Sequence, residues 1–310
     1  MLLERLLADD TAGDPMTGLR WTRRTTAKVA DLLATRGFEI SPNTVARLLH
    51  DLDYSLRVNR KAIATTHSPD RNAQFEYIAD LRQRFQHQRW PIISVDSKKR
   101  ELVGLFKNPG ARWARTARPV YDHDFRTDAR GVGIPYGIYD LVANRGTIVV
   151  GVSHDTPAFA AQAIAHWWRH EGRPAYRGTD RLLILADTGG SNGARCAAWK
   201  TELQAHVATA FELEVTVAHY PTGASKWNPI EHRLFSEISK NWAGEPLDSY
   251  QKILNFIRTT RTHTGLRVSA YLDRRHYPSG LRPSPDQLQA LRLRPHDTLP
   301  RWNYTISAAL

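Results

Sequence analysis

The sequence contains almost no cysteine, since Cys196 is the only one among 310 residues. A single cysteine can form neither an intramolecular disulfide bond nor a cysteine-based zinc site, so both devices are excluded. This usage is typical of a protein from a reducing cytoplasm, and we interpret Cys196 as a small hydrophobic core residue.

Long apolar stretches are also missing. No run approaches the roughly 18 apolar residues that a membrane-spanning helix needs. The first residues, MLLERLLADDTAGD, contain acids and lack the basic front and apolar core of a signal peptide. These absences argue against membrane insertion and secretion, and we expect a cytoplasmic protein.

Acidic residues are outnumbered. Lys and Arg total 43 against 31 Asp and Glu, which gives a formal net charge of +12 and a sequence pI of about 10.0. The 41% hydrophobic and 24% charged residues are ordinary for a folded globular protein, so disorder is not expected. A positive surplus of this size suits a polyanionic partner, and without membrane signals nucleic acid is the better candidate.

Residues 1–20 predict an N-terminal helix and a linker. A short apolar helical pattern is broken by glycine and proline; its residues are Leu2, Leu3, Leu6 and Leu7, and the breakers are Gly13, Pro15 and Gly18.

Residues 21–62 predict a helix-turn-helix. The first helix ends at Gly37, and the second begins with Ser41 as N-cap and Pro42 at the first helical position. Two short helices joined by a tight turn are typical of this DNA-binding motif, although a plain helical hairpin is the alternative. The apolar faces consist of Val29, Leu32 and Leu33 in the first helix and Val45, Leu48, Leu49 and Leu52 in the second. The predicted DNA contacts are Asn43, Thr44, Arg47, Arg57, Arg60 and Lys61.

An amphipathic linking helix is expected within residues 63–88, and the main domain within residues 89–245. The helix has Phe75, Ile78, Leu81 and Phe85 on one side. In the main domain, PIISVD predicts a strand, with ELVGLF as its hairpin partner across SKKR. A loop rich in glycine and arginine follows, then one or two strands, and then helix and strand alternate to NPIEHRLFSEISKNW. This order predicts an α/β domain of the RNase H-like class, with a mixed five-stranded sheet flanked by helices.

Residues 246–310 are rich in proline and arginine and predict a basic C-terminal extension. One more helix is indicated by Tyr250, Ile253, Leu254 and Ile257. Both a solvated, loosely packed tail and a DNA-contacting extension fit this composition.

Two buried strands end in acids. Asp96 closes IISVD and Asp187 closes LLILAD, and strands that are apolar throughout lie in the interior of a sheet. If the strands are parallel neighbours, the two aspartates meet at one edge, where ligand sites of α/β sheets lie. Two close carboxylates repel unless a cation lies between them. Oxygen ligands alone favour Mg²⁺ or Mn²⁺ over zinc.

Glu231 is the third candidate acid. It lies on the same helix face as Leu234, Phe235, Ile238 and Trp242, and a carboxylate at the head of a core-facing stripe needs a partner. The alternative is a capping box, in which Asn228 is the N-cap and Glu231 binds only backbone N–H groups. Together the three acids predict a site that holds two metal ions for phosphodiester chemistry.

Several residues near these acids are candidate DNA contacts. Ser191 and Asn192 lie in the glycine-rich TGGSNG loop, which is not a phosphate-binding Walker A loop because no Gly-Lys-Ser/Thr follows. Lys226 suits a phosphate, and Trp227 suits either base stacking or core packing. Lys98 and Lys99 follow Asp96 directly. The 13 histidines form no His-Glu-x-x-His motif, so zinc is not expected.

Long stretches of the chain resemble the Rhodopirellula-type DDE transposase family of bacterial insertion sequences. The stretches that carry the resemblance run from about Leu19 to Tyr304 and include VDSKKRELVGLFKNPGARW, LLILADTGGSNGAR, HYPTGASKWNPIEHRLFSEISKNW and WNYTI. The resemblance implies an RNase H-like catalytic domain and Mg²⁺ dependence. It also maps the metal-binding acids of the family onto Asp96, Asp187 and Glu231.

We therefore expect a DNA transposase that cleaves and joins insertion-sequence ends with two Mg²⁺ ions per site, for which Mn²⁺ can substitute. Its partner is double-stranded DNA at the element ends and the target. By analogy with DDE enzymes we expect a homo-oligomer on DNA, associated with the bacterial nucleoid. The alternatives are a catalytically silent or truncated DNA-binding remnant that acts as a regulator, and a nuclease on the same fold.

Overall fold

The computed structural model of the chain describes residues 11–13, 20–22, 25–54 and 69–309. It divides into two compact units, residues 1–63 and residues 64–310. The helix expected around Leu2–Leu7 and the predicted DNA contacts Arg57, Arg60 and Lys61 lie outside the described residues.

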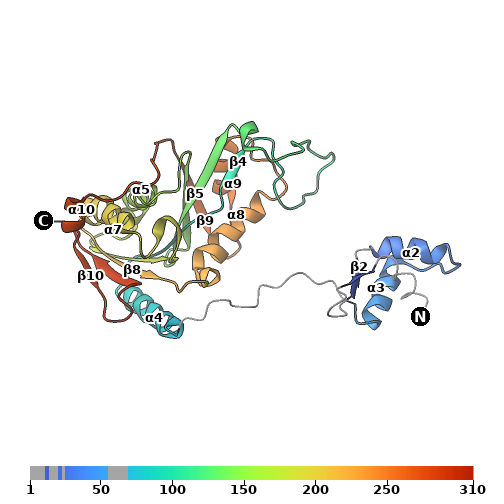
Figure 1. The fold of residues 1–310 in the computed structure, drawn as a ribbon, viewed down its shortest axis with the longest axis horizontal. Helices are drawn as coiled ribbons and strands as arrows, with labels where there is room; N and C mark the ends of the chain where they lie inside the picture. The colour runs from blue at the N-terminus through green and yellow to red at the C-terminus, as the bar shows by residue number, and fades with distance from the viewer. Residues whose placement is uncertain (1–10, 14–19, 23–24, 55–68, 310) are drawn as a thin grey trace. The chain divides into compact units, whose positions relative to one another are not determined.

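In its described residues, the first unit contains a short antiparallel strand pair and two helices (Figure 1). The elements are β1 (Thr11–Gly13), β2 (Arg20–Thr22), α2 (Thr26–Ala34) and α3 (Pro42–Asp51). The Thr25 hydroxyl accepts from the Lys28 amide, and the Ser41 hydroxyl accepts from the Thr44 amide, so both helices begin with a side-chain cap.

The two helices pack through a small apolar core formed by Val29, Ala30, Leu33 and Val45. Leu49 and Leu52 pack against this core while partly buried, as the helical pattern predicts. The expectation that Leu48 is buried with them is wrong, because its side chain is 37% exposed. Since α3 turns by about 100° per residue, one partner helix covers only part of the predicted stripe.

Nine strands form one mixed sheet in the described part of the second unit (Figure 1). The strands are β3 (Ile92–Ser97), β4 (Glu101–Val103), β5 (Gly131–Asp140), β6 (Arg145–Gly151), β7 (Arg181–Ala186), β8 (Glu214–His219), β9 (Arg267–Asp273), β10 (Leu293–Pro295) and β11 (Asn303–Ile306).

The five central strands lie in the order β8-β7-β3-β5-β6. Strand β5 is antiparallel to both β3 and β6, whereas β7 is parallel to β3 and to β8. A meander of three strands followed by two parallel strands is the RNase H-like arrangement, so the predicted fold class is confirmed. The predicted number of five strands is wrong, because β4, β9, β10 and β11 extend the sheet to nine strands in the described residues. The hairpin predicted between β3 and the ELVGLF segment is wrong, because β4 pairs with β5.

Helices cover both faces of the sheet (Figure 1). On one face α5 (Pro157–Trp167) and α7 (Ala197–Leu203) continue into the π-helical turns η2 (Trp168–Gly172) and η4 (Gln204–Thr209) and share one apolar core. The other face carries α4 (Arg71–His87), η6 (Glu231–Phe235), α8 (Ser236–Asn241) and α9 (Tyr250–Thr259). The shorter helices are η1 (Arg126–Asp128), α6 (Arg173–Ala175), η3 (Gly190–Asn192), η5 (Ser225–Trp227) and α10 (Pro285–Gln289).

The last 60 residues complete the sheet. Strand β9 is parallel to β6 at one side, and β11 is antiparallel to β8 at the other. Tyr304 and Ile306 in β11 are fully buried, so a solvated, loosely packed tail is excluded for this part of the chain. These strands are short and separated by prolines, and such strands show little periodicity in sequence. No helix of the described residues is long and apolar enough to cross a membrane.

Candidate functional site

The carboxyl ends of β3 and β7 bring Asp96 and Asp187 together. The strands are parallel neighbours with Val95 opposite Ala186, so the residue after each of these is an aspartate. Both strands are buried as far as this point, and both aspartates are only partly exposed. The register that the sequence left open therefore puts the two acids at one edge of the sheet.

The two aspartates line a cavity of about 410 Å³. The cavity is lined by Asp96, Ser97, Asp155, Asp187, Thr188, Gly189, Gly190, Ser191, Pro221, Thr222, Gly223 and Ser225. Three of these residues are acidic, and no lysine or arginine is among them. The lining is therefore made of oxygen donors with an uncompensated negative charge, which suits a hard divalent cation.

Burial and the charge of neighbouring acids make Asp96 and Asp187 hard to ionise. Burial raises the pKa of Asp96 to about 8, and the charge of Asp187 adds to this effect. Glu231 and Asp155 raise the Asp96 pKa further, while a hydrogen bond from the Ser97 amide lowers it. Burial also raises the pKa of Asp187, against a hydrogen bond from Asn228. Close carboxylates behave in this way when no cation separates them.

Glu231 lies next to this pair but not in the lining of the cavity. It begins η6, and its charge raises the pKa of both Asp96 and Asp187. As the pattern predicts, the residues that share its face are buried; they are Leu234, Phe235, Ile238 and Trp242. Among the residues that the structure describes, no three His, Cys, Asp or Glu side chains are placed to hold a metal ion as they stand.

Asn228 connects the elements that carry the three acids. Its side-chain nitrogen donates to Asp187 Oδ1 at 3.1 Å, and its oxygen accepts from the Ser94 hydroxyl. Ser94 Oγ also accepts from the Ile230 amide at 3.2 Å. Asn228 and Ser94 are fully buried. The alternative of a capping box is therefore wrong, because the Asn228 side chain binds across the site and not the helix start.

A second buried network holds the backbone of Asp187. His219 Nδ1 lies 2.8 Å from the Asp187 carbonyl oxygen, and Nε2 lies 3.0 Å from the Tyr304 hydroxyl. A carbonyl only accepts, so Nδ1 carries the proton and Nε2 accepts from Tyr304. Burial lowers the His219 pKa to about 4 and keeps the ring neutral. Trp199 Nε1 donates to the same hydroxyl at 3.1 Å, which fixes its orientation.

Asp155 is the acid that sequence reasoning missed. It lies between β6 and α5, and its Oδ1 accepts from the Ser97 hydroxyl at 3.0 Å. Three residues separate it from the end of β6, so it lacks the pattern of an apolar strand that ends directly in an acid. Only the spatial order of the strands reveals that the end of β6 lies at the same sheet edge.

In the glycine-rich loop after Asp187, the candidate residues Ser191 and Asn192 have different surroundings. Asn192 is 2% exposed, and its Oδ1 accepts from the Tyr136 hydroxyl at 2.9 Å. Ser191 is also buried but lines the cavity. Gly190 has φ of +71°, a conformation in which glycine is favoured, so it enables the turn.

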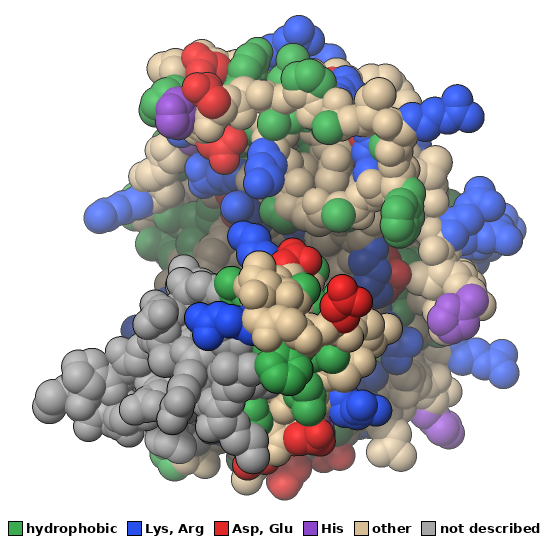
Figure 2. Space-filling view, turned by 90° about the vertical axis from the view of Figure 1, so that its right-hand side faces the viewer, with side chains coloured by type: hydrophobic (Ala, Val, Ile, Leu, Met, Phe, Trp, Pro, Cys, Tyr) green, Lys and Arg blue, Asp and Glu red, His purple; other side chains and the backbone are tan. Residues whose placement is uncertain are grey.

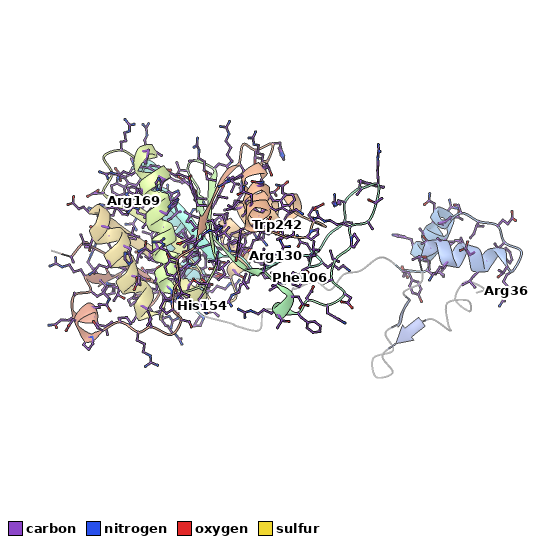
Figure 3. The ribbon with its side chains drawn as sticks, turned by 90° about the horizontal axis from the view of Figure 1, so that it is seen from above. Arg36, Phe106, Arg130, His154, Arg169 and Trp242 are labelled. Atoms are coloured by element: carbon purple, nitrogen blue, oxygen red, sulfur yellow. The ribbon has the colours of Figure 1, made fainter. Side chains whose placement is uncertain are left out.

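Lys98 and Lys99, which follow β3, also differ in burial. Lys98 is largely buried, lies 3.5 Å from a Glu101 oxygen and 4.9 Å from the centre of the Trp242 ring, which is labelled in Figure 3. Lys99 is exposed. The charge of Lys98 is therefore used within the fold, and Lys99 is open to a ligand.

Trp227 is packed against neighbouring side chains but only partly buried. Its ring packs against Phe75 at 5.6 Å and has Arg71 and Lys226 over it at 4.7 and 4.2 Å, yet 43% of its surface is exposed.

In the helix pair, Asn43 and Arg47 are exposed and Thr44 is half-buried. Figure 2 shows Lys and Arg side chains spread over the viewed face and not gathered in one patch.

Comparison with known families gives one match over nearly the whole chain. The family described as Rhodopirellula transposase DDE domain matches residues 2–308. No curated protein gives a significant match.

Solved structures give matches at low similarity. The Mos1 transposase paired-end complex with left transposon end shares 17% identity at a TM-score of 0.42, and the Mos1 strand transfer complex shares 17% at 0.44. A pre-cleavage Mos1 transpososome shares 16% at 0.44. Each match covers 82% of this chain and 68% of the other. The fold class here therefore depends on the strand topology and the family match.

Proposed function

This chain belongs to the family of Rhodopirellula transposase DDE domains, and we propose that it cleaves and joins DNA with divalent metal ions held by Asp96, Asp187 and Glu231. The observation that carries the proposal is the pairing of Asp96 with Asp187 at the ends of parallel strands, in a cavity without a basic side chain.

The donor set fits Mg²⁺ or Mn²⁺. All the candidate ligands are carboxylates, and burial together with the charge of neighbouring acids raises the pKa of Asp96 and of Asp187. Two divalent ions bound there would supply the charge that activates a water or a 3′-hydroxyl group and stabilises the leaving oxygen. Glu231 does not line the cavity, so its side chain would have to move toward Asp96 and Asp187 to bind the same ions.

The chain's own residues fix the placement of these acids. Asn228 orients the Asp187 carboxylate, the Ser97 amide binds Asp96, and the His219 ring holds the Asp187 backbone. Such placement matters because phosphodiester displacement needs in-line geometry and acids that do not reorganise during the reaction. We assign this catalytic role to residues 89–245.

We propose double-stranded DNA, at element ends and at the target, as the partner. The net charge of +12 favours a polyanion, and the α3 face with Asn43, Thr44 and Arg47 supports major-groove contact by residues 21–62. Residues 246–310 add arginines next to the sheet, and a homo-oligomer would bring two element ends together.

A strand-transfer assay tests the proposal. The purified full chain is incubated with labelled terminal DNA of the element that encodes it and a target plasmid, with Mg²⁺, with Mn²⁺ or with EDTA. We expect metal-dependent cleavage and joining, and we expect Asp187→Asn to abolish both while DNA binding in a mobility-shift assay is retained.

The assay also separates the alternatives. Cleavage without joining would indicate a nuclease on the same fold. DNA binding without cleavage in either metal would indicate a silent remnant that acts as a regulator. Full activity of Asp187→Asn would refute the metal assignment.

A further inference from the structure

A third carboxylate lines the cavity beside Asp96 and Asp187. This residue, Asp155, contacts the Ser97 hydroxyl at 3.0 Å and so is tied to the residue that follows Asp96. Strand β6 runs in the same direction as β3, because both are antiparallel to β5 between them. The chain that leaves β6 therefore reaches the same edge as the two aspartates.

Asp155 and Glu231 approach this edge from opposite faces of the sheet. Asp155 leads into α5, whose Phe159 and Ile164 pack in the same core as Val95. Glu231 begins η6, whose Leu234 packs with Ile148 and Val150 in the core of the other face. Since neighbouring residues of a strand point to opposite faces, the two acids flank the Asp96 and Asp187 pair on its two sides.

A buried hydroxyl gives independent support for a ligand in this cavity. Ser191 lines it and is 8% exposed, and its Oγ has no hydrogen-bond partner among the described residues. A buried hydroxyl without a hydrogen-bond partner is unfavourable, so such groups usually face a water or a ligand. A hydrated cation offers water oxygens to the hydroxyl and positive charge to the acids.

We propose that this cavity is a divalent-cation site in which Asp155 is an additional carboxylate ligand, on the opposite side from Glu231, and Ser191 contacts the water shell of the ion. The proposal rests on the proposed function, because it adds a ligand to the same site. Asp155 would then be a fourth carboxylate of the site, in addition to Asp96, Asp187 and Glu231.

Mn²⁺ binding to the DNA-free full chain tests the proposal without any activity measurement. The loss of the free Mn²⁺ signal in electron paramagnetic resonance gives affinity and stoichiometry for the wild type, Asp155→Asn and Asp96→Asn. Asp180→Asn is the matched control. Asp180 is an exposed acid at the start of β7, the strand that Asp187 follows at its other end. Asparagine keeps the acceptor for Ser97, so Asp155→Asn removes charge but not that contact.

We expect Asp155→Asn to weaken Mn²⁺ binding about 10-fold or more or to remove one ion, and we expect Asp180→Asn to bind like the wild type. Wild-type binding by Asp155→Asn together with weakened binding by Asp96→Asn would overturn this proposal and leave the proposed function intact. Wild-type binding by both variants would instead remove the metal site on which the proposed function depends. If Asp155→Asn does not fold, Asp155→Ser answers the same question.

Ser191→Ala tests the hydroxyl separately. We expect it to weaken Mn²⁺ binding about 2- to 5-fold while the metal-free protein melts no earlier than the wild type, because the hydroxyl lacks a protein partner. Unchanged binding would overturn the contact between Ser191 and the ion's water shell.

Discussion

The helix pair of residues 25–54 and the sheet edge around Asp96 differ in how they are built. In the helix pair, the candidate DNA contacts lie within five residues of α3, and four small or medium side chains form its core. At the sheet edge, Ser94, Asn228 and Tyr304 come from distant parts of the chain and are fully buried. Local, exposed contacts tolerate single losses, whereas a buried network depends on each member.

The largest expected effect comes from the sheet edge. Asp96→Asn should lower DNA cleavage at least about 10³-fold, because it removes the carboxylate that we propose as a central metal ligand. DNA affinity should change less than about twofold, since the contacts of the helix pair remain. Rates from single-turnover cleavage and affinities from fluorescence anisotropy check both. If Asp96→Asn cleaves DNA at the wild-type rate, the sheet edge is not the site of cleavage.

The metal-free sheet edge should also make stability depend on pH. The Asp96 pKa is raised from 3.8 to about 8 by burial and by Asp187, so the folded state holds a proton that the unfolded state has lost. The contribution of this group to stability is therefore greatest below pH 4 and falls as pH rises to about 8, by on the order of 5 kcal/mol.

Urea unfolding in EDTA at pH 5.5 and pH 8 measures this change. Asp96→Asn should flatten much of the pH dependence, and Mg²⁺ should restore stability at pH 8 because it binds the ionised acids. A metal-free wild type that is equally stable or more stable at pH 8 would contradict the electrostatic account of the site.

Substitutions in the buried network should have smaller effects than substitutions of the acids that it orients. Asn228→Ala removes the donor to Asp187 and the acceptor of Ser94, so cleavage should fall about 10- to 100-fold and Mn²⁺ affinity should fall with it. Asn255→Ala, which alters an exposed asparagine on α9, is the control and should have no effect. Equal behaviour of the two variants would show that the network does not position Asp187.

The smallest effect is expected in the helix pair. Arg47→Ala should weaken DNA binding about 5- to 10-fold and reduce the slope of log affinity against log salt by about 1, while Mn²⁺ binding stays unchanged. Arg36, in the turn after α2 and labelled in Figure 3, is the control on the same unit. If Arg36→Ala weakens binding more than Arg47→Ala does, the recognition face is not the exposed side of α3.

Local pattern predicted much of the fold. The cap at Ser41, the apolar strands before Asp96 and Asp187, and the stripe behind Glu231 follow from periodicity and capping chemistry, which act over a few residues. The pairing of β4 with β5 and the edge strands β9 to β11 did not follow from pattern, since short strands gain their stability from partners far away in sequence.

The candidate site shows the same division. Asp96 and Asp187 could be chosen because each ends an apolar strand, but Asp155 could not, since it follows a loop. Asn228 was visible only as a possible helix cap, and its contacts with Ser94 and Asp187 join positions 134 and 41 residues apart in the chain.

By itself, the sequence determined where most helices and the central strands form, which acids end buried strands and that the chain carries a large positive surplus. Tertiary structure alone decided that β3 and β7 are parallel neighbours, that β6 delivers Asp155 to the same edge, and that Asn228 reaches Asp187. The physical reason is range: periodicity and capping are set by adjacent residues, whereas strand order and the meeting of buried charges depend on how the whole apolar core packs.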